Sequence, residues 1–107
     1  MHTPHPGSTE QVTVRIDRDF EDIVPIFLAN RRKDLHTLRH ALTSADFATI
    51  QTLGHRMKGD GGGYGFDRIS EIGGAMELAA IRHDHAATEQ HIGQLENFLA
   101  RLQVEYR

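Results

Sequence analysis

Cysteine and tryptophan are both absent from this chain of 107 residues. Without cysteine, the protein can form no disulfide framework, no thiol nucleophile and no cysteine-ligated zinc site. Long apolar runs are also missing: the longest, such as residues 23–29, cover only a few positions, so no segment is expected to span a membrane. Met1 is not followed by a basic segment and an apolar stretch, so we expect no secretory signal and a cytoplasmic location.

Basic residues are fewer than acidic ones, with 12 lysines and arginines against 15 aspartates and glutamates, for a formal net charge of −3. A groove for nucleic acid normally carries a basic excess, so no nucleic-acid partner is expected. The length is that of one domain, and hydrophobic residues make up 38% of it. These values predict a single folded domain with a small core rather than a disordered chain.

Residues 1–10 contain two of the three prolines and few apolar side chains, which is typical of a loose tail. Val12, Val14 and Ile16 then alternate with polar residues, a pattern that indicates a short extended segment. A lone strand has no partner, so we expect this segment to lie against helices rather than in a sheet. The chain is therefore divided into residues 1–18, a tail with a short extended or irregular segment, and residues 19–107, a helical bundle.

From residue 19 onward, apolar side chains recur at steps of three and four, which is the spacing of amphipathic helices. Pro25 falls near the start of the first helix, where a missing backbone N–H is tolerated. Ser44 is the expected N-cap of the second helix, which carries an apolar face that includes Leu53 and Met57.

Two further helices follow the second. The third is expected over residues 66–82, and Asp84 can cap the fourth. The apolar stripe of the fourth helix is expected to continue through Leu102 and Tyr106. Four amphipathic helices with short connections predict an all-α fold, an antiparallel up-down four-helix bundle.

Glycine is concentrated in one segment, residues 59–65, which read GDGGGYG. A Walker A loop is excluded because Lys58 precedes the glycines instead of following them, and the dinucleotide pattern G-x-G-x-x-G fails in every register. Two interpretations remain. The segment is either a loop between helices, which local rules favour, or a helix that continues through glycines because something large must approach its surface.

A His-x-x-Lys-Gly motif leads into these glycines, and a further glycine, an apolar helix face and a Met-Glu pair follow it. The residues of this pattern are His55, Lys58, Gly59, Gly65, Ile69, Ile72, Met76 and Glu77. The pattern resembles the histidine-containing phosphotransfer (HPt) domain family, and the resemblance runs from about Asp19 to Tyr106. The sequence departs from the family at residues 60–63, where the family more often has Ser and Ala, so residues 60–64 stay open as helix or loop.

The resemblance implies a phosphorelay carrier of two-component signalling rather than an enzyme, without kinase activity of its own. It implies that His55 accepts a phosphoryl group from a receiver-domain aspartate and passes it on, and that Lys58 attracts the phosphoryl oxygens. The implied partners are a response-regulator receiver domain and a hybrid sensor kinase. Mg²⁺ is expected on the receiver domain, so the chain itself, a monomer by expectation, needs no metal or other cofactor.

If the second helix is continuous, His55 falls on an outward flank, because successive residues turn by about 100°. Gly59 and Gly62, four and seven residues further on, lie on the same flank. Glycine in a helix interior costs about 0.5–1 kcal/mol relative to alanine, so a functional compensation is expected. We expect Gly59 and Gly62, together with Arg56 and Gln51, to form the surface on which the partner docks.

Other functions remain as alternatives. The first is a non-catalytic helical adaptor, or an inactive HPt-like bundle, that binds signalling proteins without carrying phosphate. The second is a small metal-dependent enzyme, because His36 and His40 have the i, i+4 spacing that can bind zinc. No acidic residue completes a H-E-x-x-H motif, so we interpret both histidines as exposed to solvent.

Overall fold

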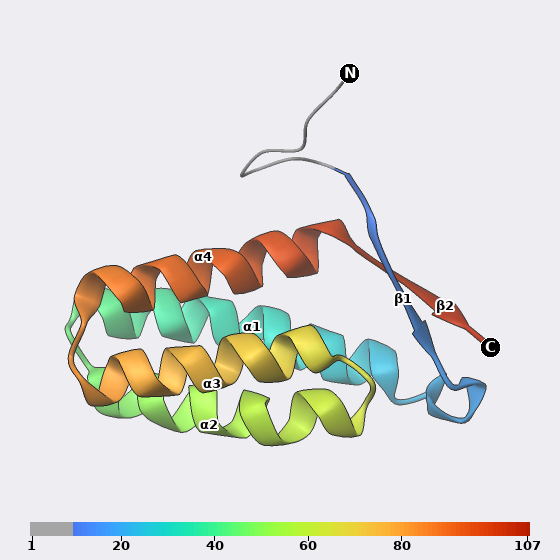
Figure 1. Cartoon of the computed structure of the whole chain (residues 1–107), viewed down its shortest axis with the longest axis horizontal. Helices are drawn as coiled ribbons and strands as arrows, with labels where there is room; N and C mark the ends of the chain where they lie inside the picture. Colours follow the sequence, from blue (N-terminus) through green and yellow to red (C-terminus); the bar gives the residue numbers. More distant parts are fainter. Residues whose placement is uncertain (1–9) are drawn as a thin grey trace.

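The computed structural model describes residues 10–107, and four helices make up most of this part of the chain. They are α1 (Val24–Thr43), α2 (Phe47–Gly63), α3 (Asp67–Ile81) and α4 (His85–Arg101). Short turns connect the helices at alternating ends of one bundle, and neighbouring helices run antiparallel (Figure 1). The expected all-α four-helix bundle is confirmed, whereas residues 1–9 of the expected tail lie outside the described residues.

The core of the bundle consists of the apolar side chains that recur at steps of three and four. Side chains that are fully buried between the helices include Leu38, Ile50, Met57, Ile69, Ile72, Met76, Ile92 and Leu95. Burial of each such side chain contributes about 1.5–3 kcal/mol relative to exposure. None of the helices within residues 10–107 combines the length and the apolar character needed to cross a membrane.

The turn between α1 and α2 differs from the expectation at Ser44. The Ser44 hydroxyl donates a hydrogen bond back to a carbonyl in the last turn of α1, so it is not free to cap α2. Asp46 is the N-cap instead, and its carboxylate accepts a hydrogen bond of 3.1 Å from the backbone N–H of Thr49. The expected positions of Pro25 in the first turn of α1 and of Asp84 as the N-cap of α4 are confirmed.

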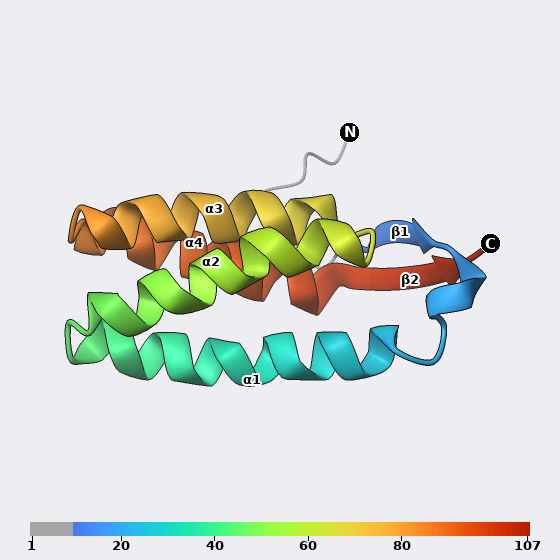
Figure 2. The same ribbon diagram turned by 90° about the horizontal axis from the view of Figure 1, so that it is seen from below.

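The extended segment forms β1 (Val12–Ile16), and it has a partner. It pairs in parallel with β2 (Leu102–Tyr106), with Val12 opposite Leu102 and Ile16 opposite Tyr106. Two expectations are therefore wrong: β1 does not lack a partner strand, and the helical stripe of α4 does not continue past Arg101. Figure 2 shows the two strands side by side beyond the end of the bundle.

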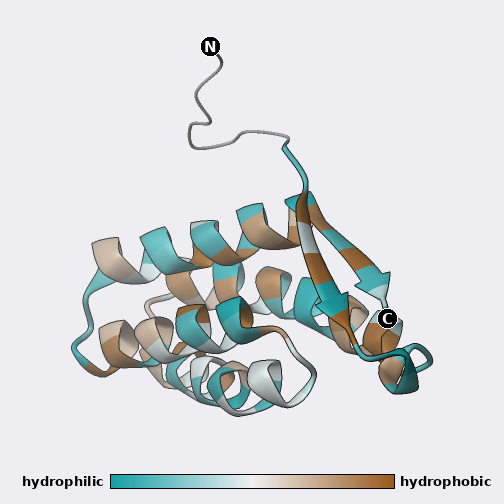
Figure 3. Ribbon diagram, turned by 45° about the vertical axis from the view of Figure 1, so that its right-hand side comes forward, coloured by the Kyte–Doolittle hydropathy of each residue, from teal (hydrophilic) through white to brown (hydrophobic). Residues whose placement is uncertain are grey.

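The sequence of β2 explains why the helical interpretation failed. Leu102 and Tyr106 are four residues apart, a spacing that fits one face of a helix and also one face of a strand. Val104 between them fits only the alternation of a strand, in which Gln103 and Glu105 are exposed on the other face. The same alternation is visible along both strands in Figure 3. After β1, one turn of 3₁₀ helix, η1 (Arg18–Phe20), leads the chain into α1.

Candidate functional site

His55 lies in the middle of α2, and its side chain is 72% exposed. Its Nδ1 atom is 2.8 Å from Oε2 of Glu77, a residue of α3 whose side chain is only 15% exposed. An ionised carboxylate accepts hydrogen bonds and cannot donate them, so this contact requires a proton on Nδ1. In the neutral ring, Nε2 then carries the free lone pair and is the nucleophilic nitrogen.

Lys58 approaches the same carboxylate from the next turn of α2. Its Nζ atom is 3.9 Å from Oε1 of Glu77, and its side chain is 60% exposed. The aliphatic stem of Lys58 passes close to Gly74, where a Cβ atom would lie 3.5 Å from Cδ of the lysine. The structure thus brings His55, Lys58 and Glu77 together, with one carboxylate oriented towards two basic groups.

Close contact between the backbones of α2 and α3 makes this arrangement possible. A Cβ atom at Gly73 would lie 2.6 Å from Cβ of Met57, and one at Gly54 would lie 2.8 Å from the carbonyl oxygen of Gly73. Neither position can hold a larger residue without separating the helices. The two glycines therefore bring Glu77 within hydrogen-bonding distance of His55.

Helix α2 continues through the glycine segment to Gly63, so the loop interpretation of residues 60–63 is wrong. A Cβ atom at Gly59 or Gly63 would have no neighbouring atom within 4 Å, and Gly62 is also exposed. Gly61 is the exception, because it is buried against α3. The flank of α2 that follows His55 is therefore bare backbone over nearly two turns.

The C-terminal half of α2 is also attached to α1 by Arg31, whose side chain is only 13% exposed. The guanidinium lies 4.8 Å from the centre of the Phe27 ring, 2.9 Å from Asp34 and 3.8 Å from Asp60 of α2. Burial raises the pKa of Asp34 above its ordinary value, and the positive charges of Arg31 and Arg56 oppose that shift. Arg31 thus links α1 to Asp60, in the glycine-rich end of α2, through an ion pair.

Arg56 and Gln51 complete the residues that the sequence indicated. Both are exposed on α2, and Gln51 precedes His55 by one helical turn. Arg56 lies on the side of α2 towards α1, where it lines a shallow groove and its positive charge acts to lower the pKa of Asp34. It is therefore not part of the group formed by His55, Lys58 and Glu77. The expected docking residues therefore surround His55 on more than one side of α2.

Sequence reasoning did not assign Glu77 a role, although the Met-Glu pair was part of the motif. Folding two antiparallel helices about Gly65 sets Ala75, not Glu77, opposite His55. Side chains on a helix tilt towards its N-terminus, so in an antiparallel pair the side chain of His55 tilts towards Glu77 and that of Glu77 tilts back towards it. This tilt was the signal that could have identified the glutamate.

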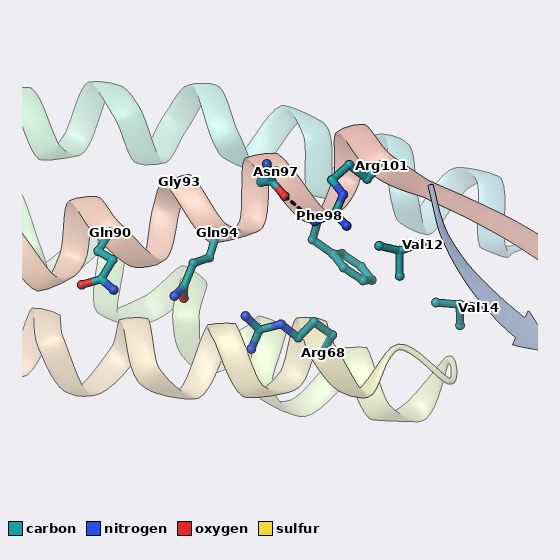
Figure 4. A pocket seen from close by; sticks show the side chains of 9 residues that line it. All are labelled: Val12, Val14, Arg68, Gln90, Gly93, Gln94, Asn97, Phe98 and Arg101. Atoms are coloured by element: carbon teal, nitrogen blue, oxygen red, sulfur yellow. Dashed lines mark hydrogen bonds between the residues drawn. The ribbon is translucent and has the colours of Figure 1, made fainter. Parts of the chain in front are cut away.

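The remaining histidines of the described residues form no comparable site. His36 and His40 are exposed on α1, and residues 10–107 contain no group of three or more histidine and acidic side chains that could hold a metal ion. A groove of about 750 Å³ lies between β1, α3 and α4, where Val12, Phe98 and Arg68 are among its lining residues (Figure 4). It contains none of the residues around His55.

Comparison with known proteins gives one match. A model of the Hpt domain family matches residues 22–105, which include all four helices and the contact between His55 and Glu77. Searches of curated proteins and of solved structures find no match to the chain.

Proposed function

We propose, because the chain belongs to the Hpt domain family, that His55 receives a phosphoryl group from an aspartate of a response-regulator receiver domain and passes it on. Hpt domains carry phosphoryl groups in two-component signalling and are not themselves kinases. The observation that supports His55 as the carrier is its exposed ring with Nδ1 held by Glu77 at 2.8 Å. The other nitrogen, Nε2, is then available to a partner protein.

The transfer follows from this protonation state. The Nε2 lone pair attacks phosphorus, the bond between phosphorus and the aspartyl oxygen breaks, and the aspartate leaves as a carboxylate. His55 then carries the phosphoryl group on Nε2 and a proton on Nδ1, so the ring gains a positive charge. The carboxylate of Glu77, 2.8 Å from Nδ1, stabilises that charge, and no proton has to move during the step.

Lys58 has the complementary role. Its ammonium group attracts the oxygens of the incoming phosphoryl group. The ion pair with Glu77, 3.9 Å between Nζ and Oε1, keeps this ammonium group on the same side of α2 as the imidazole. The metaphosphate-like transition state carries negative charge on these oxygens, and a nearby cation stabilises it. In this proposal the receiver domain supplies Mg²⁺, and the chain contributes no metal or other cofactor of its own.

The receiver domain docks, in our proposal, on the bare flank of α2. Gly59 and Gly62 present no side chain there, so a partner backbone can approach the helix closely. Gln51 and Arg56 provide polar contacts on either side of His55. A hybrid sensor kinase reaches the same histidine through its own receiver domain, and a single copy of the chain suffices for both partners.

The test uses a receiver domain carrying ³²P on its aspartate, mixed with the full chain. We expect label on the chain that is labile in acid and stable in base, as phosphohistidine is, and no label on a His55→Gln variant. The substitution is at an exposed site, so the free energy of unfolding should change by no more than about 0.5 kcal/mol, and the melting temperature should change little. His36→Gln, at an exposed histidine of α1, is the matched control and should be labelled like the parent.

Two outcomes contradict the proposal. Equal labelling of the His55→Gln variant would place the phosphoryl group elsewhere. Binding of the receiver without any labelled histidine would favour the non-catalytic adaptor instead.

A further inference from the structure

Ser70 of α3 makes two hydrogen bonds with the backbone of α2. Its hydroxyl donates to the carbonyl oxygen of Lys58 at 2.9 Å and accepts from the N–H of Gly62 at 2.7 Å. These two backbone groups are separated by four residues, so they are the pair that bond to each other in an α-helix. A side chain from the neighbouring helix thus bridges one step of the α2 hydrogen-bond ladder.

Gly61 provides the space for this bridge. A Cβ atom there would lie 2.7 Å from the backbone nitrogen of Ser70 and 2.8 Å from its Oγ atom. The bridge also lies where α2 most needs support from a neighbouring helix, because glycine has a lower helix propensity than every other residue except proline. Four of the five residues from Gly59 to Gly63 are glycine.

The bridge is connected to the proposed site through Lys58. The carbonyl that Ser70 holds belongs to the residue whose ammonium group lies 3.9 Å from Glu77. Glu77 in turn holds Nδ1 of His55. The position of the Lys58 ammonium relative to the imidazole depends on where the backbone of residue 58 lies.

We propose that Ser70 is a positioning residue for phosphoryl transfer, which acts by fixing the α2 backbone at Lys58 and so the lysine beside His55. This rests on the proposed function of His55. If Ser70 merely stabilised the fold, replacing it would lower the stability of the domain, and the effect of the replacement would not depend on Lys58. A positioning residue that acts through Lys58 must lose its effect once the lysine side chain is removed.

The experiment combines amide hydrogen exchange with transfer kinetics on the full chain. For Ser70→Ala we expect the Gly62 amide to exchange on the order of tenfold faster, because it loses the hydrogen bond to the Ser70 hydroxyl. Transfer from the phosphorylated receiver should slow several-fold. In a Lys58→Ala background, adding Ser70→Ala should speed Gly62 exchange again but leave the already reduced transfer rate unchanged.

Ser44→Ala is the matched control, since that hydroxyl also donates to a helix carbonyl, but at the end of α1. It should leave both Gly62 exchange and transfer unchanged. Unaltered Gly62 exchange in Ser70→Ala would overturn the bridge, and unaltered transfer would reduce Ser70 to a structural residue. Equal slowing with and without Lys58 would show that Ser70 acts by another route. Absence of label on the parent would overturn the carrier function, and with it the positioning role of Ser70. The Gly62 exchange rates of the parent and of Ser70→Ala would still test the hydrogen-bond bridge in that case.

Discussion

Alanine substitutions in the glycine segment should change stability in opposite directions at Gly59 and Gly61. At Gly59 a Cβ atom has no neighbour within 4 Å, so only helix propensity changes. The gain should be about 0.5–1 kcal/mol, which raises the melting temperature by roughly 2–6 °C in a domain of this size. At Gly61 the new Cβ would lie 2.7 Å from the nitrogen of Ser70 and 2.9 Å from the carbonyl oxygen of Phe66.

Both of those neighbours are backbone atoms, so they can move only if α2 and α3 separate. Overpacking of this kind costs about 1–3 kcal/mol, which exceeds the propensity gain, and Gly61→Ala should therefore destabilise the domain. Urea unfolding followed by circular dichroism measures both variants, with Gly93→Ala on α4 as a control, since that position also has no neighbour within 4 Å. Loss of stability in Gly59→Ala would mean that the segment is not helical there. A stable Gly61→Ala would mean that α2 and α3 are further apart than described.

Three further predictions concern Lys58, Gly62 and Asp46. Lys58→Ala should slow transfer without abolishing it, and an unchanged rate in quench-flow measurements at low and high salt would contradict the role of its charge. Gly62→Leu should still fold, because its Cβ would lie 3.4 Å from Oγ of Ser70, yet transfer should fall by up to about 100-fold as the side chain obstructs the receiver. Hydrogen bonds from Thr49 lower the pKa of Asp46, so its carboxylate stabilises α2 above the unfolded pKa, and this contribution is lost as pH falls through the folded value. The melting temperatures of Asp46→Ala and the parent should therefore differ near pH 7, and the difference should shrink as the pH falls through the lowered pKa of Asp46. A difference that stays constant with pH would contradict the cap.

The helices could be predicted from sequence because each rests on local information. Side chains such as Ile69, Ile72 and Met76 recur at helical spacing and are buried, and Asp84 precedes α4 as a cap. The alternation of Val12, Val14 and Ile16 indicated the extended segment that forms β1, but neither β2 nor the pairing could be predicted, because a parallel pair joins Val12 to Leu102 across almost the whole chain. No local pattern encodes such a contact, and tertiary packing selected the strand for a segment that also fits a helix.

The candidate site divides in the same way. The spacing of His55, Lys58 and Gly59 within one helix was sufficient to predict that they are neighbours on its surface, because residues three and four apart lie side by side. Glu77 and Ser70 belong to α3, and their contacts depend on how closely and in what register the two helices pack. That register follows from glycines at positions 54 and 73, whose effect is visible only once both helices are in place.

Four of the five glycines of α2 therefore fall into two groups with different causes. Gly54 and Gly61 face α3 at distances that exclude a Cβ atom, so the packing of the helices accounts for them. Gly59 and Gly63 have open space where a Cβ would lie, and alanine there would favour the helix. The fold gives no reason for these two, and both follow His55 on the exposed part of α2. In our proposal a requirement outside the fold accounts for them: bare glycine lets a partner protein approach the backbone beside His55 closely.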